Sequence, residues 1–468
     1  MPLTFSHRLR EGVEIQQGPA GLWLFCPHTG GLAAWKSLQP LPLVRALGGA
    51  WLDQEAMAAH FAPGPSGPAN PSFQLFLLRL IAAGLLDLRV RENDQPIFDV
   101  SPAPTEEALR PPEGSPAGPL RLNRFAYLRA QDGGLLLESP LTPHRLWLWH
   151  PPLLGLVNNL SAGREVTPAD AGEAACLALL RNLGLAEPVA APEADDSLSF
   201  WEFHDLLFHT RSLTGRQVYP SGGTYRFAGH RPSLPVIKPA TGREVVELPP
   251  PSSAMAARLA RPLAQVLESR RSQREFAPRP LTLDELGAFL QASARVQNII
   301  PSRQHSEDLS FRPYPSAGAR HPLEIYPLVR SCQGLASGAY HYDPLRHVLE
   351  PIASQPQALV ELLADNPHHL EGPHAPQVSL YLTVRLGRTA WKYQSISYKL
   401  IQQDLGGLYQ TFYLVATALG LAPCAIGNLD APRVGQALGL DWRAEPVVGW
   451  FTLGCPPQPA PAAGGATS

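Results

Sequence analysis

Apolar residues in the second half of the chain follow strand and helix periods in turn. Residues 323–329 and 378–386 alternate or run apolar, as half-buried and buried strands do. Residues 397–421 repeat apolar positions with a helical period, and Gly420 suits the end of that helix. Another apolar run, over 447–453, predicts a last strand. The pattern predicts an α+β fold, in which helices flank a sheet.

The first half carries a similar order of elements twice. Short strands are followed by helical segments, and each series closes with an amphipathic helix before a glycine, Gly84 or Gly184. In the second series residues 131–134 read Gln-Asp-Gly-Gly, a hairpin signal between two strands. We therefore expect a degenerate duplication, with one unit over 1–95 and another over 120–190.

Proline-rich stretches mark the boundaries of these segments. We expect a linker over 96–119, and a helix followed by a proline-rich connector over 191–252. The catalytic part is expected over 253–456. Residues 457–468 are rich in Pro, Ala and Gly, so we expect a disordered tail there.

Composition narrows the class of protein. The chain has 468 residues and a net charge of −2, which argues against a general nucleic-acid binder. Its five cysteines form no CxxC pair, which argues against a disulfide framework or a zinc site, and no metal is expected. The N-terminus lacks a signal-peptide pattern, and no apolar run reaches the ~18 residues of a membrane span. We expect a soluble, cytoplasmic protein without membrane contact.

Positive charge is concentrated at residues 270–276, which read Arg-Arg-Ser-Gln-Arg-Glu-Phe and follow a helix-like run over 256–268. Guanidiniums present forked donors that suit phosphate oxygens. Farther along, residues 312–322 form a proline-rich turn with small residues at its centre, which allows backbone to approach a flat ligand. A solvated basic turn is the alternative for the first motif alone, but the pair favours a phosphate-bearing cofactor.

These two motifs resemble the FMN-binding signature of the nitroreductase superfamily. Further segments narrow the resemblance to the SagB/ThcOx-type azoline dehydrogenases, flavoenzymes that oxidise thiazolines and oxazolines in ribosomal peptides to thiazoles and oxazoles. The segments are Leu323-Glu324-Ile325-Tyr326, Ala339-Tyr340-His341-Tyr342-Asp343-Pro344, Trp391-Lys392-Tyr393, Tyr398-Lys399 and Gly406-Gly407-Leu408-Tyr409-Gln410. The resemblance covers residues 255–455 well and the first half more loosely. It implies a nitroreductase-like fold with FMN at a homodimer interface.

The resemblance also assigns roles within the arginine cluster. Arg270 would meet the FMN phosphate, Ser272 the phosphate or the ribityl chain, and Arg274 the N1/O2 edge of the flavin. A cation at that edge favours the reduced, anionic flavin. Arg271 is assigned to the cofactor without a specific contact. The resemblance does not extend to the residues after the last strand, where many nitroreductases carry basic residues and this chain has none, so Arg320 or Lys399 is a candidate helper at the phosphate.

Two other segments are assigned to the flavin by the same resemblance. Pro315, Ser316, Ala317 and Gly318 would line it, from the partner subunit. The backbone N–H of Ile426 or Gly427 would face flavin N5, because the segment follows the long helix as in the family. An ordinary turn between a helix and a strand is the alternative for the second segment.

The resemblance places the catalytic pair at Lys392 and Tyr393. Azoline oxidation sends a hydride to the flavin and requires a base for a proton. A tyrosine has a pKa of ~10 and is a weak base, but an adjacent ammonium favours its phenolate. The alternative is an exposed lysine beside a packing tyrosine. Neighbouring residues of a helix do not share a face, so the pair needs irregular backbone to converge.

The element order of the first half resembles the winged-helix-like peptide clamps that hold leader peptides by strand addition. The alternative is two small domains that only pack on the catalytic part. The partners implied are an azoline-containing peptide, a cyclodehydratase and a second copy of the chain. Two other functions stay open: an NAD(P)H-dependent FMN reductase of nitroaromatics or quinones, and a non-catalytic scaffold for a peptide-modifying complex.

Overall fold

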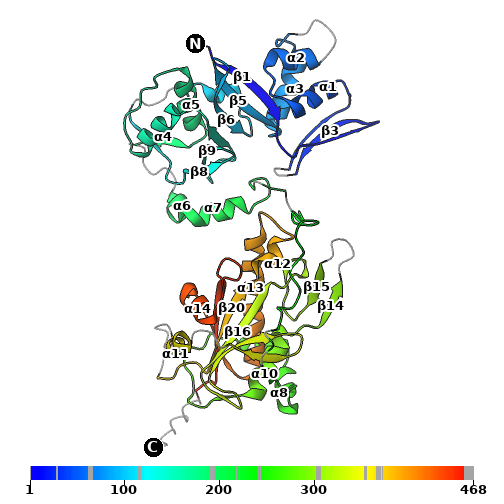
Figure 1. Ribbon diagram of the computed structural model, residues 1–468, viewed down its shortest axis with the longest axis vertical. Helices are drawn as coiled ribbons and strands as arrows, with labels where there is room; N and C mark the ends of the chain where they lie inside the picture. Colours follow the sequence, from blue (N-terminus) through cyan, green and yellow to red (C-terminus); the bar gives the residue numbers. More distant parts are fainter. Residues whose placement is uncertain are drawn as a thin grey trace, which may run out of the picture. The chain divides into compact units, whose positions relative to one another are not determined.

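The computed structural model describes residues 2–27, 30–61, 67–112, 118–189, 196–217, 219–220, 222–240, 242, 244–301, 307–352, 356–364, 370 and 373–457. The chain forms two compact units, Met1–Ser221 and Gly222–Ser468 (Figure 1). No helix in the described part of the chain is long and apolar enough to cross a bilayer.

The first unit is built on an antiparallel sheet of six strands. In sheet order these are β1 (Thr4–Leu9), β5 (Leu86–Glu92), β6 (Gln95–Ser101), β10 (Arg145–Leu148), β9 (Gly134–Glu138) and β8 (Tyr127–Gln131). Both predicted series contribute strands to this sheet. The two halves, which the sequence predicts as separate units, therefore share one sheet within one compact unit.

Smaller elements complete this unit. The short strands are β2 (Glu14–Gly18), β3 (Gly21–Cys26), β4 (Gly31–Trp35), β7 (Leu120–Leu122) and β11 (Ala186–Pro188). The helices are α1 (Leu41–Gly49), α2 (Gln54–Phe61), α3 (Pro71–Ala82), the 3-10 helix η1 (Glu106–Leu109), α4 (Pro152–Ser161), α5 (Ala171–Asn182), α6 (Asp196–Ser199) and α7 (Phe203–Arg211). The predicted hairpin is confirmed, with positive φ at Asp132 and Gly133, and so are the glycine helix ends at Gly84 and Gly184.

The two faces of the six-stranded sheet differ in character because side chains alternate along a strand. Leu88 and Val100 are fully buried in the core that the sheet forms with the helices. Asp87, Ser101 and Arg145 occupy neighbouring strand positions and belong to the other face, where Arg145 lies opposite Ser101 across β10 and β6. This second face is polar.

Two predicted boundaries differ in the structure. The segment 96–119, expected as a linker, contains most of β6 and η1, because its apolar residues Phe98 and Val100 pack in the core. The connector 191–252 is divided, with α7 in the first unit and the residues from Gly222 onward in the second. From residue 458 onward, the predicted tail lies outside the described residues.

The second unit is an antiparallel sheet of seven strands flanked by helices, which is the α+β class predicted. In sheet order the strands are β12 (Val246–Glu247), β19 (Val348–Pro351), β18 (Gly338–Asp343), β16 (Leu323–Val329), β20 (Val378–Val384), β22 (Val447–Gly454) and β21 (Ala422–Ile426). Short pairs form outside it, β13 (Leu281–Thr282) with β17 (Cys332–Gln333) and β14 (Asn298–Pro301) with β15 (Asp308–Phe311).

The helices of this unit are α8 (Ser253–Leu259), α9 (Leu263–Ser269), α10 (Leu283–Ala294), the 3-10 turn η2 (Ala317–Ala319), α11 (Pro356–Ala364), α12 (Leu386–Ala390), α13 (Ser397–Leu419) and α14 (Ala431–Leu438). Helix α13 lies against the sheet and contacts α8, α9, α10 and α12, while α11 and α14 pack against each other (Figure 1). The long helix is confirmed and ends at Gly420, whose φ is +71°. The single helical run predicted over 256–268 is wrong, because Pro262 divides it into α8 and α9.

Candidate cofactor and catalytic site

Lys392 and Tyr393 lie in irregular backbone between α12 and α13, so the objection that helix neighbours face apart does not apply to them. Their side chains converge on Gly318. A Cβ atom added at Gly318 would stand 2.4 Å from the Tyr393 hydroxyl and 3.2 Å from Lys392 Nζ. Gly318 has a φ of +58°, which L side chains rarely adopt. The structure thus brings the predicted catalytic pair to the turn predicted to line the flavin.

Glu307 and Tyr225 surround the ammonium of Lys392. Glu307 Oε1 is 3.4 Å from Lys392 Nζ, and the Tyr225 ring centre is 5.4 Å from it. Burial alone would lower the pKa of Lys392, but the hydrogen bond with Tyr225 and the charge of Glu307 outweigh it, so this pKa lies above its usual range. Lys392 is therefore a cation at neutral pH.

The hydroxyl of Tyr393 does not ionise as readily as the sequence predicted. Burial raises its pKa, and Lys392 lowers it as expected, but Tyr225 and Glu307 add to the effect of burial. The net result is a pKa above the usual range. Tyr393 is a neutral phenol at neutral pH. The sequence argument, which expected Lys392 to favour a phenolate, is corrected on this point.

The backbone of the pair is held by residues 223–225. The N–H groups of Thr224 and Tyr225 both donate to the carbonyl oxygen of Lys392, at 2.9 and 3.2 Å, and Gly223 forms a β-bridge with Tyr393. Sequence reasoning missed this segment because it lies inside the stretch that was interpreted as a proline-rich connector. No residue pattern there signals a role.

The turn at 315–318 is fixed to α13. Asp404 accepts hydrogen bonds from Ser316 Oγ at 2.5 Å and from the Ala317 N–H at 3.0 Å. Gly407, one turn farther along the helix, allows the turn to approach, since a Cβ there would be 3.2 Å from Pro315 Cγ. Burial raises the pKa of Asp404, against the effect of these two hydrogen bonds. Sequence reasoning missed Asp404, which stands far from the turn along the chain.

Tyr413 of α13 joins the arginine cluster to β21. Its hydroxyl is 2.9 Å from Ser272 Oγ and accepts from the Ala425 N–H at 2.8 Å, and its ring lies 5.3 Å from the Arg270 guanidinium. Ala425 directly precedes Ile426, the end of β21. The structure therefore brings the predicted phosphate-binding residues close to the predicted N5 segment, around a tyrosine that the sequence did not single out.

The arginine cluster fits an anionic cofactor. Within the described residues, Arg270, Arg271 and Arg274 have no carboxylate partner, and the Arg271 guanidinium meets only the carbonyls of Glu268 and Arg270. Arg271 and Arg274 are exposed, and a Cβ at Gly427 would meet nothing within 4 Å. Three uncompensated guanidiniums beside an open strand end are suited to a phosphate and a flat ring.

Arg320, a predicted helper at the phosphate, is not available for that role. It is fully buried and donates to Glu307 Oε2 at 2.6 Å, to Ser233 Oγ at 2.6 Å and to the carbonyl of Arg388 at 2.8 Å. The guanidinium instead fixes Glu307 beside Lys392. The residues next to Arg320 in the sequence do not indicate that it is buried.

The two predicted cofactor clusters contact different sides of α13. Asp404 and Tyr413 are nine residues apart, which at 3.6 residues per turn is about two and a half turns, or opposite sides of the helix. Lys392, Tyr393 and Gly318 belong to the Asp404 side, and Ser272 to the Tyr413 side. A single chain does not gather both clusters around one space.

Two segments of the chain match known protein families, one in the second unit and one in the first. Residues 267–455 match the nitroreductase family, and residues 120–218 match the family described as cyanobactin oxidase ThcOx. A putative nitroreductase of Methanocaldococcus jannaschii is 34% identical over 176 residues, which are 38% of this chain and 83% of that protein.

Two peptide-processing proteins are also similar. The microcin B17-processing protein McbC of Escherichia coli is 30% identical over 137 residues, 28% of this chain and 50% of that protein. The trifolitoxin-processing protein TfxB of Rhizobium leguminosarum bv. trifolii is 31% identical over 186 residues, 38% of this chain and 49% of that protein. The chain spans about half the length of these two relatives. Taken with the archaeal relative and the two family matches, these similarities show that the chain belongs to the nitroreductase family, as a SagB/ThcOx-type member.

Proposed function

We propose that this protein is an FMN-dependent dehydrogenase that oxidises thiazoline or oxazoline rings of a peptide to azoles, with oxygen as the electron acceptor. The convergence of Lys392 and Tyr393 on Gly318 carries the proposal, because it joins the predicted proton-handling groups to the predicted flavin-lining turn. Similarity to proteins named for microcin B17 and trifolitoxin processing supports a peptide as the substrate.

Arg270, Arg271 and Ser272 would hold the FMN phosphate, and Arg274 would stand at the flavin edge that gains charge on reduction. The backbone of Ile426 and Gly427 would face the ring. Bound FMN supplies an acceptor for the hydride that leaves the azoline ring. Because the two clusters contact opposite sides of α13, we propose that the complete site combines Arg270 to Arg274 of one chain with the turn at 315–318 of a second, in a homodimer.

The second hydrogen leaves the ring as a proton, and Tyr393 Oη is the group we propose to accept it. Since that phenol is protonated at rest, it acts as a base only after it loses its own proton. The ammonium of Lys392 favours this loss, and Glu307 and Tyr225 hold the ammonium in place. Lys392 is therefore assigned to stabilising the phenolate and Tyr393 to the proton transfer.

The double variant Lys392→Ala with Tyr393→Phe tests the catalytic assignment. We expect it to retain FMN, at about one per chain by absorption after heat release, because neither residue belongs to the arginine cluster. Azole formation, measured by mass spectrometry as the loss of two hydrogens per ring, should fall by at least ~100-fold, the usual share of a general base. Unchanged turnover of a thiazoline peptide would remove the pair from the mechanism.

A second function is an NAD(P)H-dependent reductase of nitroaromatics or quinones. The similarity to a putative nitroreductase favours it. Rapid bleaching of the flavin by NADPH would support this alternative, whereas bleaching by a thiazoline peptide would support the dehydrogenase.

A further inference from the structure

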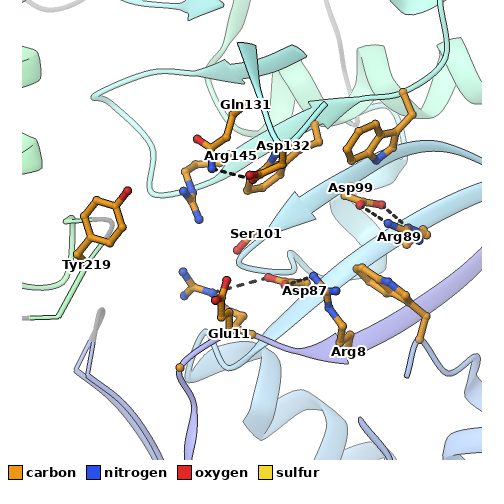
Figure 2. Close-up of a pocket in the computed structure, with 15 residues that line it drawn as sticks. Arg8, Glu11, Asp87, Arg89, Asp99, Ser101, Gln131, Asp132, Arg145 and Tyr219 are labelled. Carbon is orange, nitrogen blue, oxygen red and sulfur yellow. Dashed lines mark hydrogen bonds and ion pairs between the residues drawn. The ribbon is translucent and has the colours of Figure 1, made fainter. Parts of the chain in front are cut away.

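A polar cavity of about 470 Å³ lies within the first unit, on the polar face of the six-stranded sheet. Its lining comes from β1, β5, β6 and β10, from the β8–β9 turn and from the segment after β1. Figure 2 shows Arg145, Ser101, Tyr219 and Glu11 around one open space. None of these residues has a part in the flavin site proposed above.

Most of the charge in this cavity is paired internally. Arg89 donates two hydrogen bonds of 2.7 Å to Asp99, and the two charges cancel. Asp87 lies 3.3 Å from Arg8 (Figure 2). It also lies 3.8 Å from Arg10, so one carboxylate faces two guanidiniums. Glu11 and Asp132 also line the cavity, so its four arginines face four carboxylates in all, and any unpaired positive charge is local.

Arg145 is the guanidinium of this lining that lacks a bound carboxylate among the described residues. Its guanidinium lies 4.9 Å from the Trp147 ring centre, and within the described part of the chain it makes no hydrogen bond or ion pair. Glu138, which lies on the neighbouring strand, is already bound at 2.7 Å by Arg129 and at 2.7 Å by Arg211. Arg145 therefore has no carboxylate of its own.

The surroundings of Arg145 make an external anion favourable. Burial lowers the pKa of Arg145, and the positive charges of Arg10 and Arg211 lower it further, while the carboxylates of Glu138 and Asp87 oppose this without reversing it. An arginine nevertheless keeps its proton in proteins, so the charge is retained at a cost in free energy. An anion in the cavity would remove that cost through charge-assisted hydrogen bonds.

The cavity walls indicate what carries the anion. Trp51 is held between the guanidiniums of Arg8 and Arg89, at 4.4 and 4.3 Å from its ring. Trp149 also lines the cavity, and its buried Nε1–H has no acceptor among the described residues. Indole rings provide apolar surface that suits methylene groups. The combination suits a carboxylate on a short aliphatic stem.

We propose that this cavity binds an Asp or Glu side chain of the peptide on which the protein acts, with Arg145 as the main contact. The identity of the ligand as a peptide rests on the proposed function. This contact differs from strand addition at a sheet edge, because a side chain of the peptide would be bound on the open face of the sheet. It would hold the peptide at a point other than the ring that is oxidised.

Isothermal titration calorimetry on the full-length, FMN-loaded protein tests the proposal. The probe is a short peptide of Glu and Gly with blocked ends, and its control has Gln in place of Glu. We expect heat from the Glu peptide and none from the Gln peptide. Affinity should fall about tenfold or more in Arg145→Gln, since a charged hydrogen bond is lost, and stay unchanged in Arg79→Gln, an exposed arginine of α3 that does not line the cavity.

Three results would overturn the proposal: equal binding of the Glu and Gln peptides, equal affinities of Arg145→Gln and Arg79→Gln, or heat from inorganic phosphate with none from the Glu peptide. The last would assign the cavity to a phosphorylated ligand. If Arg145→Gln fails to fold by circular dichroism, the Glu and Gln peptides on the unaltered protein still decide the matter. Binding is measured without turnover, so the two proposals can fail separately. Absence of Glu-peptide binding would not contradict the dehydrogenase, and absence of azole formation would not contradict binding of the Glu peptide.

Discussion

Tyr393 shows how burial and neighbouring charge compete at one residue. The sequence argument considered only Lys392, which does lower the pKa of Tyr393, but burial is the larger effect and raises it. The residues that add to burial, Tyr225 and Glu307, are remote from Tyr393 along the chain and were not foreseen. The mechanism therefore begins from a protonated base.

This protonation state predicts the pH dependence of turnover. A base must be unprotonated to act, and the pKa of Tyr393 lies above its usual range, so kcat should rise through pH 7 to 10, about tenfold per unit. Lys392→Gln removes the charge that lowers the pKa of Tyr393, so kcat of this variant should rise at still higher pH. Steady-state kcat with a thiazoline peptide is the measurement, at saturating oxygen. A plateau between pH 7 and 8 in the unaltered protein would exclude Tyr393 as the base.

Glu307 should matter for stability as well as for the site. It is 2% exposed, and within the described residues it is the one carboxylate paired with the fully buried Arg320. Glu307→Gln leaves that guanidinium buried without a counter-ion, which costs about 3 kcal/mol of unfolding free energy. Urea unfolding followed by circular dichroism measures the loss. The exposed Glu268→Gln is the control, and an equal effect of the two variants would contradict the assignment.

The residues of the candidate site divide into those that a local motif reveals and those that it does not. Ser272, Ser316 and Lys392 stand in short motifs whose chemistry is legible from neighbouring residues. Asp404 and Tyr413 stand in a long helix, where the neighbouring residues do not distinguish them from its other polar positions. Their partners come from distant segments, so only the folded chain reveals their part in the site.

At the scale of elements, both clusters contact α13. One position in this helix, 407, requires a glycine for a steric reason. A Cβ added at Gly407 would stand 3.2 Å from Pro315 Cγ, while one added at the adjacent Gly406 would meet nothing within 4 Å. Gly407→Ala should push the 315–318 turn from the helix and lower kcat by about tenfold, since small misplacements are costly at reacting groups. Gly406→Ala is the matched control and should keep kcat and raise stability by up to ~1 kcal/mol. Equal kcat in the two variants would show that the close approach is unimportant.

The elements that were predicted well are those with strong local signals. The hairpin at 131–134 and the end of α13 at Gly420 depend on positive φ angles, which glycine marks in the sequence. Strand β6 was missed because prolines surround it, although Pro96 stands near its start, where a strand tolerates proline. The break at Pro262 was missed because the apolar period continues across it.

At the scale of the molecule, the duplicated first half forms one sheet whose polar face carries a charged cavity. Its winged-helix ancestry stays a prediction. The second unit carries every residue assigned to FMN and to proton transfer, with its two clusters on opposite sides of α13. This arrangement is the reason for proposing a homodimer, which the sequence alone could suggest only by resemblance.

Anaerobic mixing of the FMN-loaded protein with a thiazoline peptide tests the central claim most directly. The account predicts that the flavin bleaches as the peptide loses two hydrogens per ring, that the colour returns with air, and that the double variant Lys392→Ala with Tyr393→Phe stays yellow. A flavin that ignores the peptide and bleaches only with NADPH would contradict the account, and would identify the protein as a reductase.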